Sequence, residues 1–255
     1  MTGPELTEGA PPAVRLEQVS KSFGSLRVLD DVSFSVRAGA SFAILGRSGT
    51  GKSVTLKHIV GLVQPDRGRV LVEGRDIAGL PSQALSDVRR RMGFVFQSGA
   101  LFDSFSVGEN VAFVLRRHTD LPEPEIVAQA RERLSRVGLE RDYDKMPGAL
   151  SGGMRKRAGL ARAMALDPPI LLVDEPSAGL DPITSEEIDD LLLELKRTEG
   201  TTLVVVTHNI PSARRMADEL VMLHDGRIVA QGTVAELEAS EQPLVRAFMH
   251  STHSG

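Results

Sequence analysis

Apolar and polar positions along this 255-residue chain follow two periods, one typical of strands and the other of helices. Unbroken apolar runs at 42–45, 93–96, 170–173 and 203–206 predict short strands, and the last two are typical of strands buried on both faces. Apolar residues at helical spacing fill much of the chain between these runs. The pattern predicts an α/β core built from a sheet and helices.

Other segments predict strands of a different kind. Residues 14–19 and 33–36 alternate between apolar and polar, and 69–74 follows a turn signal as a further strand. Residues 221–223 and 227–229 flank the dipeptide Asp225-Gly226, which is a hairpin signal.

Helical periodicity dominates between residues 98 and 166. Pro122, Gly138 and Pro147-Gly148 separate three helical segments there, at 107–118, 123–137 and 153–166. Helices are also predicted at 53–60, 82–91 and 183–197, and Thr233–Glu236 is a capping box.

This distribution predicts the organisation of the chain. We expect one α/β domain over 13–242, with an α-helical subdomain at 98–166 inserted in it. Residues 1–12 are rich in Gly, Pro, Thr and Glu, which predicts a flexible N-terminal tail without the regions of a signal peptide. A short amphipathic segment opens the C-terminal tail, 243–255.

Composition excludes several classes of function. With 41% hydrophobic and 25% charged residues the chain is ordinary for a soluble globular protein, and its net charge of −4 does not favour nucleic acid as a partner. The absence of cysteine excludes disulfides and thiolate metal sites. No apolar run approaches the roughly 20 residues of a membrane span, so we expect any work on a membrane to be done from the water side.

The clearest candidate chemistry lies in a glycine-rich loop between a predicted strand and a predicted helix. Gly, four residues and Gly-Lys-Ser in this context form a phosphate-binding P-loop. Its glycines let the backbone turn N–H groups inward, the helix adds its positive end, the lysine reaches β- and γ-phosphates, and the serine hydroxyl can bind Mg²⁺. The predicted nucleotide-binding residues are Gly46, Arg47, Ser48, Gly49, Thr50, Gly51, Lys52 and Ser53.

Polar residues at other strand ends complete this candidate site. Asp174 and Glu175 follow a buried strand, where Asp174 can hold Mg²⁺ beside Ser53 and Glu175 can act as general base on water. Gln97 ends another strand and can place its amide oxygen near Mg²⁺ or the attacking water, although a surface amide is the alternative.

Two further positions are ambiguous on the residues alone. Phe23 can stack on adenine or belong to the core, and His208 can sense the γ-phosphate or be structural. Leu150-Ser151-Gly152-Gly153-Met154 is a second glycine loop at a helix start, hence a second anion site. Two half-sites for one nucleotide predict a dimer in which ATP lies between two copies.

Taken in their order along the sequence, these motifs resemble those of ABC transporter nucleotide-binding subunits, and the resemblance covers nearly the whole chain. The resemblance implies a P-loop NTPase (RecA-like) core with an antiparallel β subdomain and the inserted helical one. It implies ATP and Mg²⁺ as cofactors, a head-to-tail dimer, and catalytic roles for Glu175, His208 and Gln97. It also implies that Phe23, Ser151, Gly152, Gly153, Asp174 and Asp181 contact the nucleotide, and that Mg²⁺ is held by Ser53, Gln97 and Asp174.

The chain also shows a narrower resemblance, to the ATPases of Mla-type, MCE-associated lipid transporters. The segments that look like theirs are Phe96–Phe102, Asn110–Phe113, Arg116–Pro122 and Asp181–Thr184. It implies phospholipid or related lipid as cargo, moved between membranes. The implied partners are a membrane permease, an MCE-domain lipid-binding protein and a small STAS-domain protein. The implied location is peripheral, at the cytoplasmic face of the inner membrane.

Two alternatives stay open. One is a soluble ABC ATPase of an assembly machine that has no permease. The other is a transporter ATPase for a different cargo, such as amino acids or metal ions, because the ATPase rarely touches the cargo.

Overall fold

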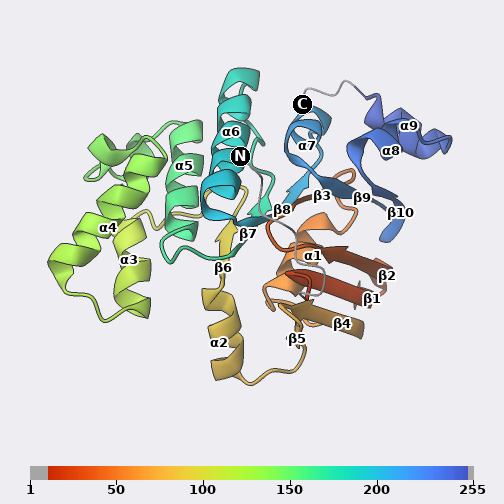
Figure 1. Ribbon diagram of the computed structural model, residues 1–255, viewed down its shortest axis with the longest axis horizontal. Helices are drawn as coiled ribbons and strands as arrows, with labels where there is room; N and C mark the ends of the chain where they lie inside the picture. Colours follow the sequence, from red (N-terminus) through yellow and green to blue (C-terminus); the bar gives the residue numbers. More distant parts are fainter. Residues whose placement is uncertain (1–10, 252–255) are drawn as a thin grey trace, which may run out of the picture.

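Two sheets, the helices that accompany them and a helical subdomain make up residues 11–251, which are the residues that this computed structural model describes (Figure 1). The greater part of the expected N-terminal tail, 1–10, and the last four residues, 252–255, lie outside the described residues. Figure 1 shows helices α3, α4 and α5 as a separate group on one side of the sheets. The predicted combination of an α/β core, an antiparallel sheet and inserted helices is confirmed.

The larger sheet has six strands in the order β10-β9-β3-β8-β7-β6. The strands are β3 (Ser41–Leu45), β6 (Met92–Val95), β7 (Ile170–Asp174), β8 (Thr202–Thr207), β9 (Glu219–His224) and β10 (Arg227–Gly232). All pairs except β9 with β10 are parallel. Every residue of β3 and β8 is buried, which explains their unbroken apolar runs.

The parallel arrangement decides where the candidate residues lie. The carboxyl ends of β3, β6, β7 and β8 meet at one edge of the sheet, because these strands run in the same direction. The P-loop, Gln97, Glu175 and His208 each follow one of these ends. Residues that are far apart in the sequence are therefore gathered at this edge.

The smaller sheet is antiparallel, in the order β2-β1-β4-β5. Its strands are β1 (Val14–Phe23), β2 (Leu26–Val36), β4 (Arg67–Val72) and β5 (Arg75–Asp76). The predicted strands 14–19 and 33–36 are parts of one long hairpin, since pairing continues to Phe23 and Leu26. Stacking of Phe34 on Phe42, with ring centroids 5.1 Å apart, joins this sheet to the larger one.

The helical subdomain contains α3 (Val107–His118), α4 (Glu123–Arg136) and α5 (Gly152–Ala163). The predicted bounds of α3 are confirmed, and Ser106 caps its start by accepting a hydrogen bond from the N–H of Glu109. Asn110 is fully buried, and its amide bonds the backbone of Phe102, Phe105 and Ser106. This side chain holds the loop that enters α3.

The remaining helices cover the larger sheet or follow it. They are α1 (Lys52–Ile59), α2 (Ser82–Arg90), α6 (Pro182–Glu199), α7 (Ile210–Met216), α8 (Val234–Glu238) and α9 (Pro243–Met249). The capping box at Thr233 and Glu236 is confirmed. Helix α7 was not predicted, although Asn209 caps it and Pro211 follows in its first turn. Within 11–251, no helix combines the length and apolar character needed to cross a membrane.

Helix α6 carries a buried carboxyl whose ionisation costs stability. Asp189 is 2% exposed; its Oδ2 accepts a hydrogen bond from Ser212 Oγ at 2.6 Å, while its Oδ1 has no hydrogen-bond partner among residues 11–251. Burial raises the pKa of Asp189 to about 6 from the ordinary value of 3.8, and nearby Asp190 and Glu186 act in the same direction. The hydrogen bond from Ser212 and the charge of Arg215 lower the pKa of Asp189.

We predict that Asp189→Asn stabilises the protein at neutral pH. Between pH 3.8 and about 6 the folded protein holds this proton more tightly than the unfolded chain, so stability falls as pH rises through that window and stays reduced above it. The variant should gain in Tm over the wild type as pH rises through the window, with no further gain above it. Glu194→Gln, an exposed carboxylate on the same helix, is the control and should show no such trend. Equal Tm values at every pH would contradict the prediction.

Candidate functional site

The P-loop connects the buried end of β3 to the start of α1. Gly46 and Gly51 both have positive φ, +156° and +97°, and Gly51 is the N-cap of α1. A Cβ at Gly46 would lie 2.5 Å from the carbonyl oxygen of Leu223, and one at Gly51 would lie 2.7 Å from that of Val28. Glycine is required at both positions because of backbone conformation and close approach. The result is a tight loop at the positive end of a helix.

Lys52 is turned into this loop. Its Nζ donates hydrogen bonds to the carbonyl oxygens of Gly46 at 2.8 Å and Arg47 at 3.0 Å, and lies 3.5 Å from Glu175 Oε1. Burial lowers the pKa of Lys52, and Glu175 and Asp174 raise it in turn. A buried amine in a loop at the positive end of a helix is suited to bind phosphate oxygens.

Ser53 and Asp174 provide oxygen ligands for a divalent cation. Ser53 Oγ donates to Asp174 Oδ1 at 3.0 Å, which places a hydroxyl and a carboxylate side by side at the ends of α1 and β7. Burial raises the pKa of Asp174, whereas the bond from Ser53 lowers it. Hard oxygen donors of this kind fit Mg²⁺, which binds through few protein ligands. Ser53 and Gln97 also line one cleft beside the P-loop.

Glu175 faces this cleft from the end of β7. It is buried, and its Oε2 lies 2.9 Å from His208 Nδ1 and accepts a bond from the His208 N–H at 3.3 Å. The cleft measures about 310 Å³ and is lined by Val28, Ser48, Gly49, Gly51, Lys52, Ser53, Val54, Gln97, Glu175 and His208. The structure thus brings together the P-loop, Gln97, the acidic pair and His208. A carboxylate held against a histidine can accept a proton from water.

Phe23 lies apart from these residues, at the end of β1. The residue is 49% exposed, and Lys21 Nζ lies 5.5 Å from the ring centroid. An exposed face of an aromatic ring can stack on the base of a nucleotide. Val28, from the next strand, lines the cleft itself and was missed by the sequence analysis, since an apolar residue in a strand gives no signal of its own.

The loop Ser151–Gly153, called here the Ser-Gly-Gly loop, is not among the residues that line this cleft. Ser151 caps α5 by accepting a bond from the Met154 N–H at 3.2 Å. A Cβ at Gly153 would lie 2.6 Å from Thr184 Cγ2, so glycine lets this loop pack against the start of α6. Asp181 caps α6 and accepts two bonds from Thr184.

The Ser-Gly-Gly loop and Asp181 therefore form a second group of predicted site residues. Both stand at helix N-termini, and Ser151, Gly152 and Asp181 are exposed. Backbone N–H groups at such positions can bind an anion that is brought by another molecule. The Ser-Gly-Gly loop and Asp181 do not line the P-loop cleft, although Asp181 and His208 line a neighbouring pocket together.

Lys156 is a second residue that sequence reasoning missed. It is buried on α5, and its Nζ donates a hydrogen bond to the carbonyl oxygen of Glu175 at 3.0 Å. Burial lowers the pKa of Lys156, while Glu175 and Asp174 raise it. It stands in a basic run, Arg155-Lys156-Arg157, which in the sequence resembles a solvated helix face.

Comparisons with known proteins agree on one class. The family model described as "ABC transporter" matches residues 29–178. The probable ribonucleotide transport ATP-binding protein mkl of Mycobacterium tuberculosis is 44% identical over 98% of this chain and 70% of its own length. The intermembrane phospholipid transport system ATP-binding protein MlaF of Escherichia coli K12 is 41% identical over 95% of this chain and 90% of its own length.

A solved structure extends the comparison to an assembly. The ATP-binding cassette MJ0796, a dimer in a post-hydrolysis state bound to ADP and Pi, superposes with a TM-score of 0.80. It is 35% identical, over 86% of this chain and 98% of that one.

Two substitutions test the assignment of the cleft. We predict that Glu175→Gln keeps nucleotide binding but lowers kcat for ATP hydrolysis by about 100- to 10,000-fold, the range of a general base. Phosphate release gives kcat, and calorimetry gives the Kd for ATP. Glu187→Gln is the control, because Glu187 is exposed and pairs with Arg157. Full activity in Glu175→Gln would mean that another group is the base.

We predict that Lys52→Ala weakens ATP binding by about 10- to 100-fold, since a charge-assisted hydrogen bond is lost. Lys57→Ala removes an exposed amine from the same helix and should leave the Kd unchanged. Unchanged binding by Lys52→Ala would exclude the phosphate contact.

Proposed function

The chain belongs to the ABC transporter family, and on this basis we propose that it drives the transport of phospholipid or a related lipid between membranes. It is an ATP-binding and ATP-hydrolysing subunit. The cargo proposal depends mainly on the similarity to MlaF, whose name assigns it to phospholipid transport and which this chain matches over nearly its full length. The fold does not distinguish cargoes, because the ATPase cleft binds only the nucleotide.

In the proposed mechanism, the P-loop N–H groups and Lys52 hold the β- and γ-phosphates of ATP. Ser53 and Asp174, with Gln97, would hold Mg²⁺, which when bound supplies positive charge that offsets the charge on the phosphates. Glu175 takes the proton of the attacking water. In the structure its carboxylate contacts His208 and lies near Lys52, so both side chains lie beside the proposed base.

We propose that two copies complete each site in head-to-tail orientation. The Ser-Gly-Gly loop of one copy then meets the nucleotide held by the P-loop of the other, and Asp181 lies beside it. The dimeric state of the solved cassette supports this arrangement. The lining of the P-loop cleft, which includes neither the Ser-Gly-Gly loop nor Asp181, supports it as well.

An aromatic patch marks the proposed docking surface for the membrane permease. Phe102, Phe105 and Phe113 lie within 5.4 to 5.7 Å of one another between ring centroids, and Phe102 and Phe113 are exposed. The patch lies shortly after Gln97, so a permease segment seated on it would be near a group that faces the nucleotide. Exposed aromatic clusters of this kind are typical of interaction sites.

The other proposed partners are an MCE-domain lipid-binding protein and a STAS-domain protein. The proposed location is the cytoplasmic face of the inner membrane, with peripheral attachment through the permease. The name of mkl favours a second candidate cargo, ribonucleotide.

Reconstitution distinguishes the two cargoes. We expect that the complex purified with this chain in detergent, placed in vesicles with ATP, moves a fluorescent phospholipid and does not take up labelled ribonucleotide. Glu175→Gln in the same complex is the control and should stop transport. Nucleotide uptake without lipid movement would replace the cargo proposal, and recovery of only soluble partners would favour an ATPase without a permease.

Replacing the patch tests the docking surface separately. We predict that Phe102→Ser with Phe113→Ser reduces co-purification of the permease by about tenfold or more, as expected when aromatic anchors are lost from an interface. ATP turnover by the isolated protein should be retained. Leu26→Ser, at an exposed leucine outside the patch, should leave co-purification unchanged.

A further inference from the structure

The amino group of Lys156 lies behind the catalytic cleft, against the backbone of the proposed base. Lys156 is 7% exposed and is in the second turn of α5, after the Ser-Gly-Gly loop at its start. Its Nζ donates to the carbonyl oxygen of Glu175 at 3.0 Å. Because the bond goes to the backbone, the Glu175 carboxylate stays free to contact His208.

The Glu175 backbone needs this support. Its φ is +49°, in the left-handed region that a residue with a Cβ rarely adopts. Three hydrogen bonds hold it: its N–H donates to Val206 at 2.9 Å, and its carbonyl oxygen accepts from the Ala178 N–H at 3.2 Å and from Lys156. Val206 is in the sheet and Ala178 is in the loop that follows β7, whereas Lys156 is in helix α5.

The lysine also affects the charge of the site. Asp174 and Glu175 are adjacent acids at a largely buried position, and isolated buried charges are costly. Lys156 and Lys52 both lie close enough to these carboxylates for the negative charges to raise the pKa of each amine. A neutral residue at 156 would remove one of the cations that offset these two acids.

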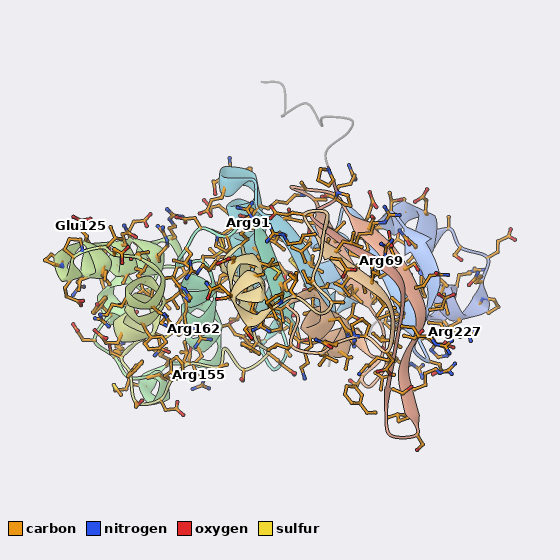
Figure 2. All side chains as sticks on the ribbon, turned by 90° about the horizontal axis from the view of Figure 1, so that it is seen from below. Arg69, Arg91, Glu125, Arg155, Arg162 and Arg227 are labelled. Carbon is orange, nitrogen blue, oxygen red and sulfur yellow. The ribbon has the colours of Figure 1, made fainter. Side chains whose placement is uncertain are left out.

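Helix α5 is firmly attached to other parts of the site. Gly159 packs directly on the segment after Gln97, where a Cβ would lie 3.0 Å from Gly99 Cα. Arg162 donates from its two terminal nitrogens to Ala100 at 2.7 Å and Gly99 at 3.2 Å. Figure 2 labels Arg162 beside Arg155, which bonds the Leu150 carbonyl oxygen at 2.9 Å just before the Ser-Gly-Gly loop. One helix therefore joins the Ser-Gly-Gly loop, the Gln97 segment and Glu175.

We propose that Lys156 is a positioning residue that fixes the Glu175 backbone and ties it to the Ser-Gly-Gly loop of the same chain. In the proposed head-to-tail dimer, on which this inference depends, that loop contacts the nucleotide of the opposite site. Lys156 then transmits nucleotide binding at one site to the base of the other. It acts through Glu175 and does not contact the substrate.

The test compares two substitutions in the full-length protein. Lys156→Met keeps the length of the side chain but removes the hydrogen bond and the charge, and Lys156→Gln keeps a shorter, neutral donor. We expect kcat for ATP hydrolysis to fall about 10- to 100-fold in Lys156→Met and less in Lys156→Gln, with KM for ATP near wild type. Arg157→Met removes a neighbouring charge that pairs with Glu187 and should retain wild-type kcat.

A double-mutant cycle tests the link to the loop. If Lys156 connects Ser151 to Glu175, Ser151→Ala combined with Lys156→Met should lose less activity than the product of the two single losses. The pair of Ser151→Ala with Arg157→Met should give the product. Independent losses in both pairs would overturn the link.

Other outcomes are equally decisive. Wild-type kcat in folded Lys156→Met or Lys156→Gln would overturn the positioning role, as would equal losses in both variants accompanied by lowered Tm. If Lys156→Met does not fold, a selective loss of kcat in Lys156→Gln still decides the matter. The assays use ATP alone, so a failure of the phospholipid proposal leaves them interpretable, and a wild-type protein without turnover would instead contradict the ATPase assignment.

Discussion

Two acids and two amines share one largely buried corner of this protein, and the rest of the site depends on their mutual compensation. Asp174 and Glu175 end a buried strand, and Lys52 and Lys156 reach them from α1 and α5. Burial raises the pKa of Asp174 and lowers the pKa values of both lysines, so each of these three groups by itself resists being charged. Together they keep a charged cluster in a place where any one of them alone would be costly.

The sheet makes this cluster possible. A parallel sheet places the carboxyl ends of several strands at one edge. The residues that follow these ends can therefore meet without being neighbours in the sequence. Glu175 and His208 meet in this way, after β7 and β8, although 33 positions separate them. The left-handed backbone at Glu175 turns the chain out of the sheet and aims the carboxylate at the cleft.

The same fold leaves the site incomplete in one chain. The Ser-Gly-Gly loop packs against the start of α6, and Asp181 caps that helix, so these two elements form one exposed surface. The P-loop cleft forms another. In the proposed dimer each surface completes the other, and α5 contacts both, through Ser151 at its start and Lys156 one turn later.

The sequence by itself determined what depends on near neighbours. The turn of the P-loop was predictable because its eight consecutive residues contain the glycines that the turn requires, and the bounds of α3 followed from local periodicity and its flanking residues. The acids and His208 could be assigned to the site because their motifs occur in a recognised order. The helix α7 was missed although its cap, Asn209, is a local signal.

Only the tertiary structure decided which distant groups touch. Nothing near Lys156 in the sequence distinguishes it from the arginines on either side, yet it alone of the three is buried against Glu175. Likewise the β1–β2 hairpin extends beyond its alternating pattern because pairing, rather than periodicity, sets its length. The physical reason is the same in both cases: contacts across the fold depend on strand register and helix packing, which no short stretch of sequence contains.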